Sequence, residues 1–306
     1  MSKANRIAMG ETVLELAKKD ERIVIVEADM SGSVNFGPFI EAFPDRHFDC
    51  GIAEQDMVGV AAGLSTCGFI PFVASFAVFA SMRALDQVRN SLCYNRFKAV
   101  VVGSHAGLET GPDGATHQAI EDIAIMRALP GMTVLVPSTP YMTKKLTEES
   151  AYCSGPVYLR LGRDSMDELY DQCEFPIGGS KTLIEGSDVT IMAAGTMVHF
   201  AMAGAEALKT RGVNARVVDM YSIKPIDKEA VLRAAKETKC IVTVEDHSII
   251  GGLGGAVCEI IAESGFGKAV RLGVKDIMGK SGKSSDLFKM YGLTAQNIYD
   301  AVLAAI

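Results

Sequence analysis

The sequence predicts an α/β protein made of two parallel-sheet α/β domains. Short apolar runs alternate with amphipathic segments along the chain, which is typical of the strands and helices of parallel sheets. The 306 residues are enough for two domains at ~150 residues each. Hydrophobic residues make up 48% of the chain and the mean hydropathy is +0.20, so a disordered protein is excluded.

The first half shows the alternation most clearly. Residues 6–18 place Ile7, Val13 and Ala17 on one helical face, and residues 99–103 form an apolar run typical of a strand buried on both faces. In chain order we expect helices at 6–18, 57–65, 82–93 and 120–127, and strands at 23–28, 71–74, 99–103, 133–136 and 156–161.

A polar stretch that contains Pro176, Gly178 and Gly179 then interrupts the pattern. We place the boundary there, with a first domain at 1–165, a linker at 166–181 and a second domain at 182–306. In the second domain we expect strands at 189–193, 215–219 and 241–245, and helices at 201–210, 228–236 and 295–306.

Charge and cysteine usage exclude several classes of protein. The formal net charge is −7 and no block of Lys and Arg occurs, which argues against a nucleic-acid partner or a polybasic membrane protein. The seven cysteines are dispersed without a CxxC pair, which indicates reduced thiols in a cytoplasmic protein and no zinc or other metal site. The charged N-terminal stretch lacks the apolar core of a signal peptide.

Residues 57–82 carry no charged side chain and are long enough to be weighed as a membrane span. Gly68 and Pro71 interrupt them, so we expect a buried helix, a turn and a buried strand instead. The segment DCGIAEQDM (49–57) places Glu54 at its head. A buried carboxylate is costly, which suggests that Glu54 has a function.

Ligands of open α/β sheets bind beyond the carboxyl ends of the strands. The residues expected at those ends lie mostly in the first domain, so we expect the site there; they are Asp29, 75–79, 105–117, Arg163 and 245–255.

The loop SHAGLETGPDGATHQ (104–118) follows the Val-rich strand and holds two histidines with an acid between them. His105 and His117 are suited to phosphate binding or proton transfer, and Asp113 to holding a hydroxyl. This combination favours function over an ordinary surface loop. Phe76, Phe79 and Met82 follow at three-residue spacing, and on a helix they would share a face, either as core or as a platform for an aromatic ligand.

Three other features carry no chemistry in our interpretation. IIGGLGGAV (249–257) does not fit GxGxxG, and GKSGKSS (279–285) lacks the first glycine of a P-loop. We interpret the first as a βα turn and the lysines of the second as solvated. Asp246-His247 follows a strand, and a lone histidine there is more often structural or at an interface.

Three segments resemble the C-terminal half of transketolase, and the resemblance covers essentially the whole chain. They are GIAEQDM (51–57), GFIPFVASFAVFASMR (68–83) and GPDGATHQAIEDIAIMRALPGMTVLVPSTP (111–140), the last with the DGxTHQ core. The resemblance implies a pyrimidine-binding domain followed by a transketolase C-terminal domain, and chemistry that depends on thiamine diphosphate.

The resemblance also implies roles around the cofactor. Glu54 would hydrogen-bond N1′ of the aminopyrimidine as the catalytic proton donor, and the uncharged segment after it would supply a dry site. Phe79 would stack on the pyrimidine with Phe76 close by, while Met82 stands where the family often has Tyr. Asp29 resembles an acid near the cofactor.

The substrate positions carry over in the same way. Four residues resemble those that grip the sugar phosphate, a task that suits Arg geometrically; they are Arg6, Ser33, His105 and Arg163. His117 and Asp113 resemble the positions that contact the hydroxyls near the cleaved bond, where His117 would assist proton transfer.

The family holds the diphosphate and Mg²⁺ with a GDG motif and a later Asn, and this sequence has neither. We therefore expect a split enzyme of the pentose phosphate pathway, active only with a partner. A second, N-terminal subunit would carry the diphosphate and Mg²⁺, thiamine diphosphate would bind at the junction, and the chains would form an α2β2 heterotetramer.

Three alternatives remain. The β subunit of a 2-oxoacid dehydrogenase has a similar size, although DGATHQ and the phosphate-gripping set argue against it. A deoxyxylulose-phosphate synthase shares DGxTHQ but is normally one long chain. A non-catalytic scaffold would not need Glu54, His105, Asp113, His117 and Arg163 together.

Overall fold

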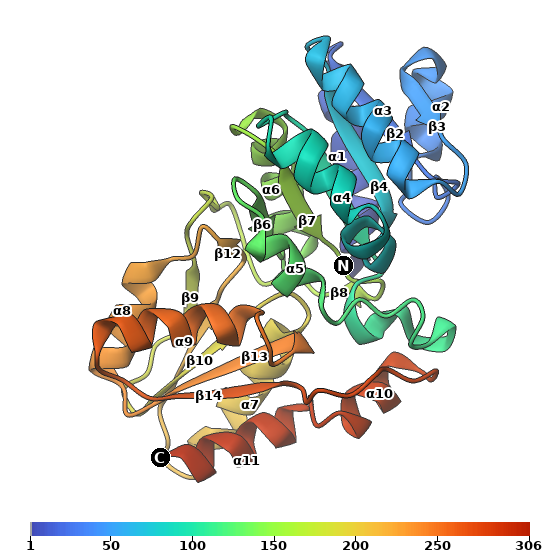
Figure 1. The fold of residues 1–306 in the computed structure, drawn as a ribbon. Helices are drawn as coiled ribbons and strands as arrows, with labels where there is room; N and C mark the ends of the chain where they lie inside the picture. The colour runs from blue at the N-terminus through green and yellow to red at the C-terminus, as the bar shows by residue number, and fades with distance from the viewer. Residues whose placement is uncertain (1) are drawn as a thin grey trace.

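A computed structural model describes residues 2–306 and confirms the predicted α/β class. Two large sheets, each flanked by helices, follow one another along the chain (Figure 1). Parallel pairing dominates in both sheets, and the central strands are buried on both faces. In β2, for example, all five residues of IVIVE are buried, which explains the unbroken apolar runs in the sequence.

The first sheet has seven strands, of which six are parallel and the edge strand β12 is antiparallel. Their order is β12 (Ser222–Lys224), β6 (Thr133–Leu135), β7 (Val157–Arg160), β5 (Val100–Ser104), β4 (Ile70–Phe76), β2 (Ile23–Glu27) and β3 (His47–Asp49). The α-helices of this half are α1 (Asn5–Ala17), α2 (Gly37–Ala42), α3 (Glu54–Thr66), α4 (Leu85–Gln87), α5 (Asp122–Ala128) and α6 (Pro140–Tyr152).

The second sheet has five strands, in the order β14 (Ala269–Val274), β13 (Ile241–Ser248), β10 (Val189–Ala193), β11 (Ala215–Asp219) and β9 (Lys181–Ile184), of which only β9 runs antiparallel to its neighbour. Its helices are α7 (Met197–Lys209), α8 (Lys228–Glu237), α9 (Leu253–Ser264), α10 (Ser284–Met290) and α11 (Ala295–Ala305). Helices α8 and α9 cover one face, and α7 and α11 cover the other (Figure 1).

The two halves are interlocked. Strand β12 follows β11 in the chain but pairs with β6 in the first sheet, and a short ladder joins β1 (Lys3–Ala4) to β8 (Ser165–Met166). One hydrophobic cluster contains Val26 and Tyr158 from the first half together with Val257 and Ile260 of α9. The division into domains at 166–181 stays a prediction.

The expected single helix at 82–93 is wrong in detail. The chain forms two π-helical turns, η2 (Phe79–Arg83) and η3 (Val88–Cys93), on either side of α4. Phe76 is the last residue of β4 and pairs with Ser104, so Phe76, Phe79 and Met82 do not share a helical face. They nevertheless pack against one small buried cluster.

The uncharged segment 57–82 forms a helix, a turn and a strand, as predicted. Across residues 2–306, no helix combines the length and the apolar character that a membrane crossing requires.

Candidate active site

The predicted site residues follow five neighbouring parallel strands at one edge of the first sheet. The strands are β7, β5, β4, β2 and β3, and their carboxyl ends lead to Arg163, His105, Phe76, Asp29 and Glu54 in that order. Parallel strands bring their carboxyl ends to one edge, which is why residues so far apart in sequence meet.

Glu54 is the first residue of α3 and is only 2% exposed. The Arg83 guanidinium donates from Nη1 to both carboxylate oxygens, at 3.0 and 2.9 Å. The same guanidinium lies over the Phe79 ring, with Cζ 4.1 Å from the ring centroid. Glu54, Arg83 and Phe79 therefore form one contiguous stack.

Two phenyl rings and two imidazoles form an aromatic cluster beside this stack. The ring centroids of Phe76 and Phe79 lie 6.1 Å apart, and Phe76 meets His105 edge-on at 4.6 Å. His117 lies 5.7 Å from Phe76 and 5.2 Å from Phe79. The cluster joins the cofactor residues predicted around Glu54 to the predicted substrate loop.

His105 is buried and adopts a left-handed backbone conformation directly after β5. Burial, followed by the charges of Arg6 and Arg163, lowers its pKa to about 4, against a smaller opposing effect of Asp113. The imidazole is therefore neutral at physiological pH, and it can donate one hydrogen bond and accept another.

Arg6 donates from Nη1 to the carbonyl oxygen of Ser33 at 3.1 Å. Burial, followed by the neighbouring charge of Arg163, lowers the pKa of Arg6 from its ordinary value. Arg6, Arg163 and His105 are thus electrostatic neighbours, and two of the three are permanently cationic. This end of the site is suited to an anionic group.

Thr110 links two parts of the predicted substrate loop through hydrogen bonds. Its hydroxyl donates to the carbonyl oxygens of His105 and His117, at 2.5 and 3.3 Å. Asp113 lies exposed at the end of the 3-10 segment η4 (Gly107–Asp113).

Among the predicted site residues, Asp29 has the weakest structural link to the rest of the site. It is exposed, adopts a left-handed conformation, and donates its backbone N–H to Asp49 Oδ1 at 3.1 Å. Within the described residues no hydrogen bond links its carboxylate to Glu54 or the aromatic cluster. Its proximity to the cofactor stays a prediction.

Sequence reasoning missed the contact of Arg83 with Glu54. A signal was present, because Arg83 is the first charged residue after the uncharged segment and lies four positions beyond Phe79. The network of Arg160, Asp122 and Asp246 beneath the loop was also missed, and these residues are buried and distant in sequence.

The residues present fit the pyrimidine end of a thiamine cofactor. A planar amino-heteroaromatic ring needs an aromatic face and a buried carboxylate, and Phe79 and Glu54 supply both. The guanidinium of Arg83, itself planar and a hydrogen-bond donor, shows that such a group can be held there. No group of three His, Cys, Asp or Glu side chains in residues 2–306 is arranged to hold a metal ion.

Comparison with protein families matches residues 1–167 to the pyrimidine-binding domain of transketolase and residues 178–298 to the transketolase C-terminal domain. A protein of Methanocaldococcus jannaschii whose name describes it as a transketolase C-terminal section is 46% identical over 98% of this chain and 96% of its own length. One of the subunits of the apulose-4-phosphate transketolase of Phocaeicola vulgatus is 40% identical over 98% of this chain and 96% of its own.

Solved structures give the same result. A split-gene transketolase described as an inactive β4 tetramer superimposes with a TM-score of 0.91 at 44% identity, covering 100% of this chain and 98% of that one. The transketolase of Campylobacter jejuni shares the fold, with a TM-score of 0.85 at 23% identity over 99% of this chain and 47% of its own.

Among sequence relatives, the 1-deoxy-D-xylulose-5-phosphate synthase of Heliobacterium modesticaldum is 39% identical, and this chain spans 45% of its length.

Proposed function

The chain belongs to the transketolase family, and on that premise we propose that it is the C-terminal subunit of a split transketolase. Together with a diphosphate-binding subunit it transfers a two-carbon ketol unit from a ketose phosphate to an aldose phosphate. The observation that carries this proposal is the buried carboxylate of Glu54, which the Arg83 guanidinium joins to the face of Phe79.

The family depends on thiamine diphosphate, which when bound supplies the carbon nucleophile that accepts the two-carbon unit. In our proposal Glu54 holds the proton shared with the pyrimidine ring nitrogen N1′. Phe79 and Phe76 supply the apolar wall against which the ring is oriented, and Met82 packs against the same small buried cluster. The low exposure of Glu54 excludes water that would compete for this hydrogen bond.

The opposite end of the site holds the sugar. We propose that Arg6 and Arg163 bind the phosphate and that neutral His105 donates a further hydrogen bond, with Ser33 beside them. His117 contacts both phenyl rings, and we place it and Asp113 at the hydroxyls near the cleaved bond. The names of the relatives include apulose-4-phosphate and 6-deoxy-6-sulfo-D-fructose transketolases, so the sugar skeleton and the pathway vary among them.

The assembly is part of the proposal. Relatives of matching length carry names of sections or subunits of transketolases, and the solved split-gene structure contains β chains alone and is described as inactive. We therefore propose that the diphosphate and Mg²⁺ are held by an N-terminal subunit, that thiamine diphosphate lies at the junction, and that the active form is α2β2.

A deoxyxylulose-phosphate synthase activity is the second candidate, because such synthases are 37–39% identical over 94–96% of this chain. We rank the synthase activity second because the synthases are about twice as long as the region that matches this chain, whereas the transketolase subunits match over almost their full lengths.

The test mixes this chain with its partner, thiamine diphosphate and Mg²⁺, and follows two reactions. Transfer of a ketol unit between sugar phosphates, lost in Glu54→Gln, supports the proposal. Glu245→Gln is the matched control, because Glu245 is an equally buried glutamate whose carboxylate caps α9 through Leu253 N and Gly254 N. Decarboxylation of pyruvate without ketol transfer would overturn the proposal in favour of the synthase or a 2-oxoacid dehydrogenase.

A further inference from the structure

The loop that carries His105, Asp113 and His117 belongs to the first half of the chain, yet the second half holds it in place. Its Leu108 is fully buried within the hydrophobic core of the second sheet, among side chains of β10, β11 and α7. Gln118 Nε2 donates to the carbonyl oxygen of Lys280 at 2.9 Å. The conformation of the substrate loop therefore depends on residues that lie far along the chain.

Asp246 provides two further contacts with the loop. It lies near the carboxyl end of β13, is 5% exposed, and accepts the Leu108 backbone N–H on both oxygens, at 3.0 and 3.1 Å. Gly107 has a positive φ of 66°, and a side chain there would collide with the Asp246 carboxylate. The Asp246 carboxylate therefore packs directly against the Gly107 backbone at the start of the loop.

Arg160, the last residue of β7, connects Asp246 to the other end of the loop. Its Nη2 donates to the carbonyl oxygen of Ala119 at 3.2 Å and to that of Asp246 at 2.8 Å. Its Nε donates to Asp122 Oδ2 at 2.8 Å, and Tyr158 Oη donates to the same oxygen at 2.7 Å. Every member of this network is nearly or fully buried.

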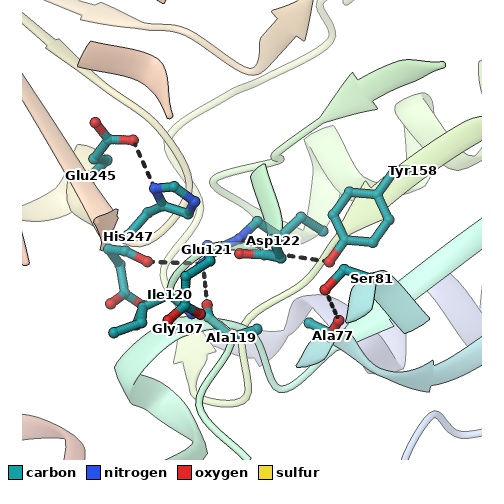
Figure 2. Close-up of polar contacts among 12 residues, drawn as sticks. Ala77, Ser81, Gly107, Ala119, Ile120, Glu121, Asp122, Tyr158, Glu245 and His247 are labelled. Atoms are coloured by element: carbon teal, nitrogen blue, oxygen red, sulfur yellow. Dashed lines mark hydrogen bonds and ion pairs between the residues drawn. The ribbon is translucent and has the colours of Figure 1, made fainter. Parts of the chain in front are cut away.

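The two ends of the loop also meet directly, since Gly107 N–H donates to the carbonyl oxygen of Ala119 at 2.9 Å. Figure 2 shows Gly107 beside Ala119, with Tyr158 directed at Asp122 to one side and His247 to the other. His247 is structural, as the sequence suggested. Its Nε2 accepts from Ala124 N–H at 3.3 Å and its Nδ1 bonds the carbonyl oxygen of Ser248 at 2.7 Å.

We propose that Asp246 is a positioning residue for the substrate loop, and that the second half of the chain thereby sets the placement of His105 and His117 against the aromatic cluster. Asp246 touches no reacting atom and acts through Leu108 and Gly107. The proposal gives the second half a part in substrate binding, and its kinetic consequences rest on the proposed function.

The physical basis is the cost of leaving buried groups without partners. Without the carboxylate, the buried Leu108 N–H has no acceptor, and the base of the loop gains freedom to move. A displacement of about 1 Å in a substrate-positioning group costs on the order of 100-fold in rate. Within residues 2–306 no hydrogen bond joins Asp246 to Glu54 or Phe79, which lie on α3 and η2, so we expect the loss of Asp246 to weaken sugar binding more than cofactor binding.

The experiment compares two variants with a matched control. Asp246→Leu removes both acceptor oxygens at similar volume, and Asp246→Asn keeps one acceptor. The control is Asp219→Leu, because Asp219 is likewise a buried carboxylate near the end of a second-sheet strand. It also joins the halves, through Ser138 Oγ and through Tyr170 Oη at 2.6 Å, but it does not touch the loop.

The first readout is hydrogen exchange of the loop peptide 104–119 in the intact chain, which needs no activity. We expect exchange to rise about tenfold in Asp246→Leu, less in Asp246→Asn, and not at all in Asp219→Leu. The second readout is kinetic: in the assembled complex, KM for the sugar phosphate rises about tenfold in Asp246→Leu, while the Kd of thiamine diphosphate stays within twofold.

Unchanged loop exchange in both Asp246 variants would overturn the proposal, as would an equal rise in Asp219→Leu. So would a loss of cofactor affinity that matches the loss of sugar affinity. If the wild-type complex transfers no ketol unit, the proposed function fails, and the loop exchange still decides whether Asp246 holds the loop. If Asp246→Leu does not fold, Asp246→Asn carries the comparison.

Discussion

The contact between Arg83 and Glu54 leads to a specific prediction about cofactor affinity. The guanidinium bonds the buried carboxylate and covers the Phe79 ring at the same time. A pyrimidine that stacks on Phe79 and bonds Glu54 needs the same space. If the proposed site binds the cofactor, Arg83 must move when it does. Arg83→Met keeps the apolar stem of the side chain and removes the need for that rearrangement.

The size of the effect follows from the two contacts that are lost. The Arg83 side chain is 47% exposed, so its pair with Glu54 contributes about 1 kcal/mol after solvent screening. A partly exposed cation–π contact contributes about 1 kcal/mol more. Together they amount to roughly 2 kcal/mol, which corresponds to about 30-fold tighter binding of thiamine diphosphate by Arg83→Met.

Isothermal titration of the assembled complex with thiamine diphosphate measures this difference. Arg89→Met is the control, because it removes the same charge from an exposed position on η3, where the Arg89 guanidinium donates to Asn90. Weaker cofactor binding by Arg83→Met than by wild type would refute the reasoning, since Arg83 would then hold the cofactor instead of occupying its place.

Three further predictions concern buried acids. Glu54→Gln lowers ketol transfer by the assembled complex by about 10²–10⁴-fold while the chain stays folded, and a loss below tenfold contradicts the role of Glu54. Arg160→Met leaves the fully buried Asp122 without its cation and lowers the free energy of unfolding by about 3–5 kcal/mol, measured in urea; a loss under 1 kcal/mol contradicts this. Burial raises the pKa of Glu109 to about 7, so the folded chain keeps a proton that the unfolded chain releases above its ordinary pKa of 4.5. The free energy of unfolding therefore falls as pH rises from 4.5 to 7, on the order of 3 kcal/mol from this group, and Glu109→Gln removes that part of the fall, whereas an unchanged pH slope between pH 5 and 8 refutes it.

Local patterns in the sequence were enough to predict the central strands and the edge of the sheet at which the candidate site lies. A run such as 99–103 is apolar because both faces of β5 are buried, and His105, the residue directly after β5, therefore lies at the carboxyl edge of the sheet. Helix α6 was missed, although the local sequence contains a helix-start signal. The Thr139 side chain accepts from Met142 N–H, and Pro140 is the first residue of the helix.

Other features depend on long-range contacts that no local pattern encodes. Strand β12 has three residues and pairs with β6, about ninety positions earlier, so its neighbours in sequence do not reveal it. Asp246 bonds Leu108 across 138 residues. Arg83 bonds Glu54 from the π-helical turn Phe79–Arg83. A regular α-helix has a different residue spacing and would point the Arg83 side chain in another direction.

The central claim is that the cofactor site is shared between this chain and a second subunit. Native mass spectrometry of this chain, purified from its own cells and supplied with thiamine diphosphate, tests it most directly. We expect assemblies of this chain with a partner subunit, and the mass of the cofactor only on those mixed assemblies. Cofactor bound to assemblies of this chain alone, or no mixed assembly at all, would contradict it.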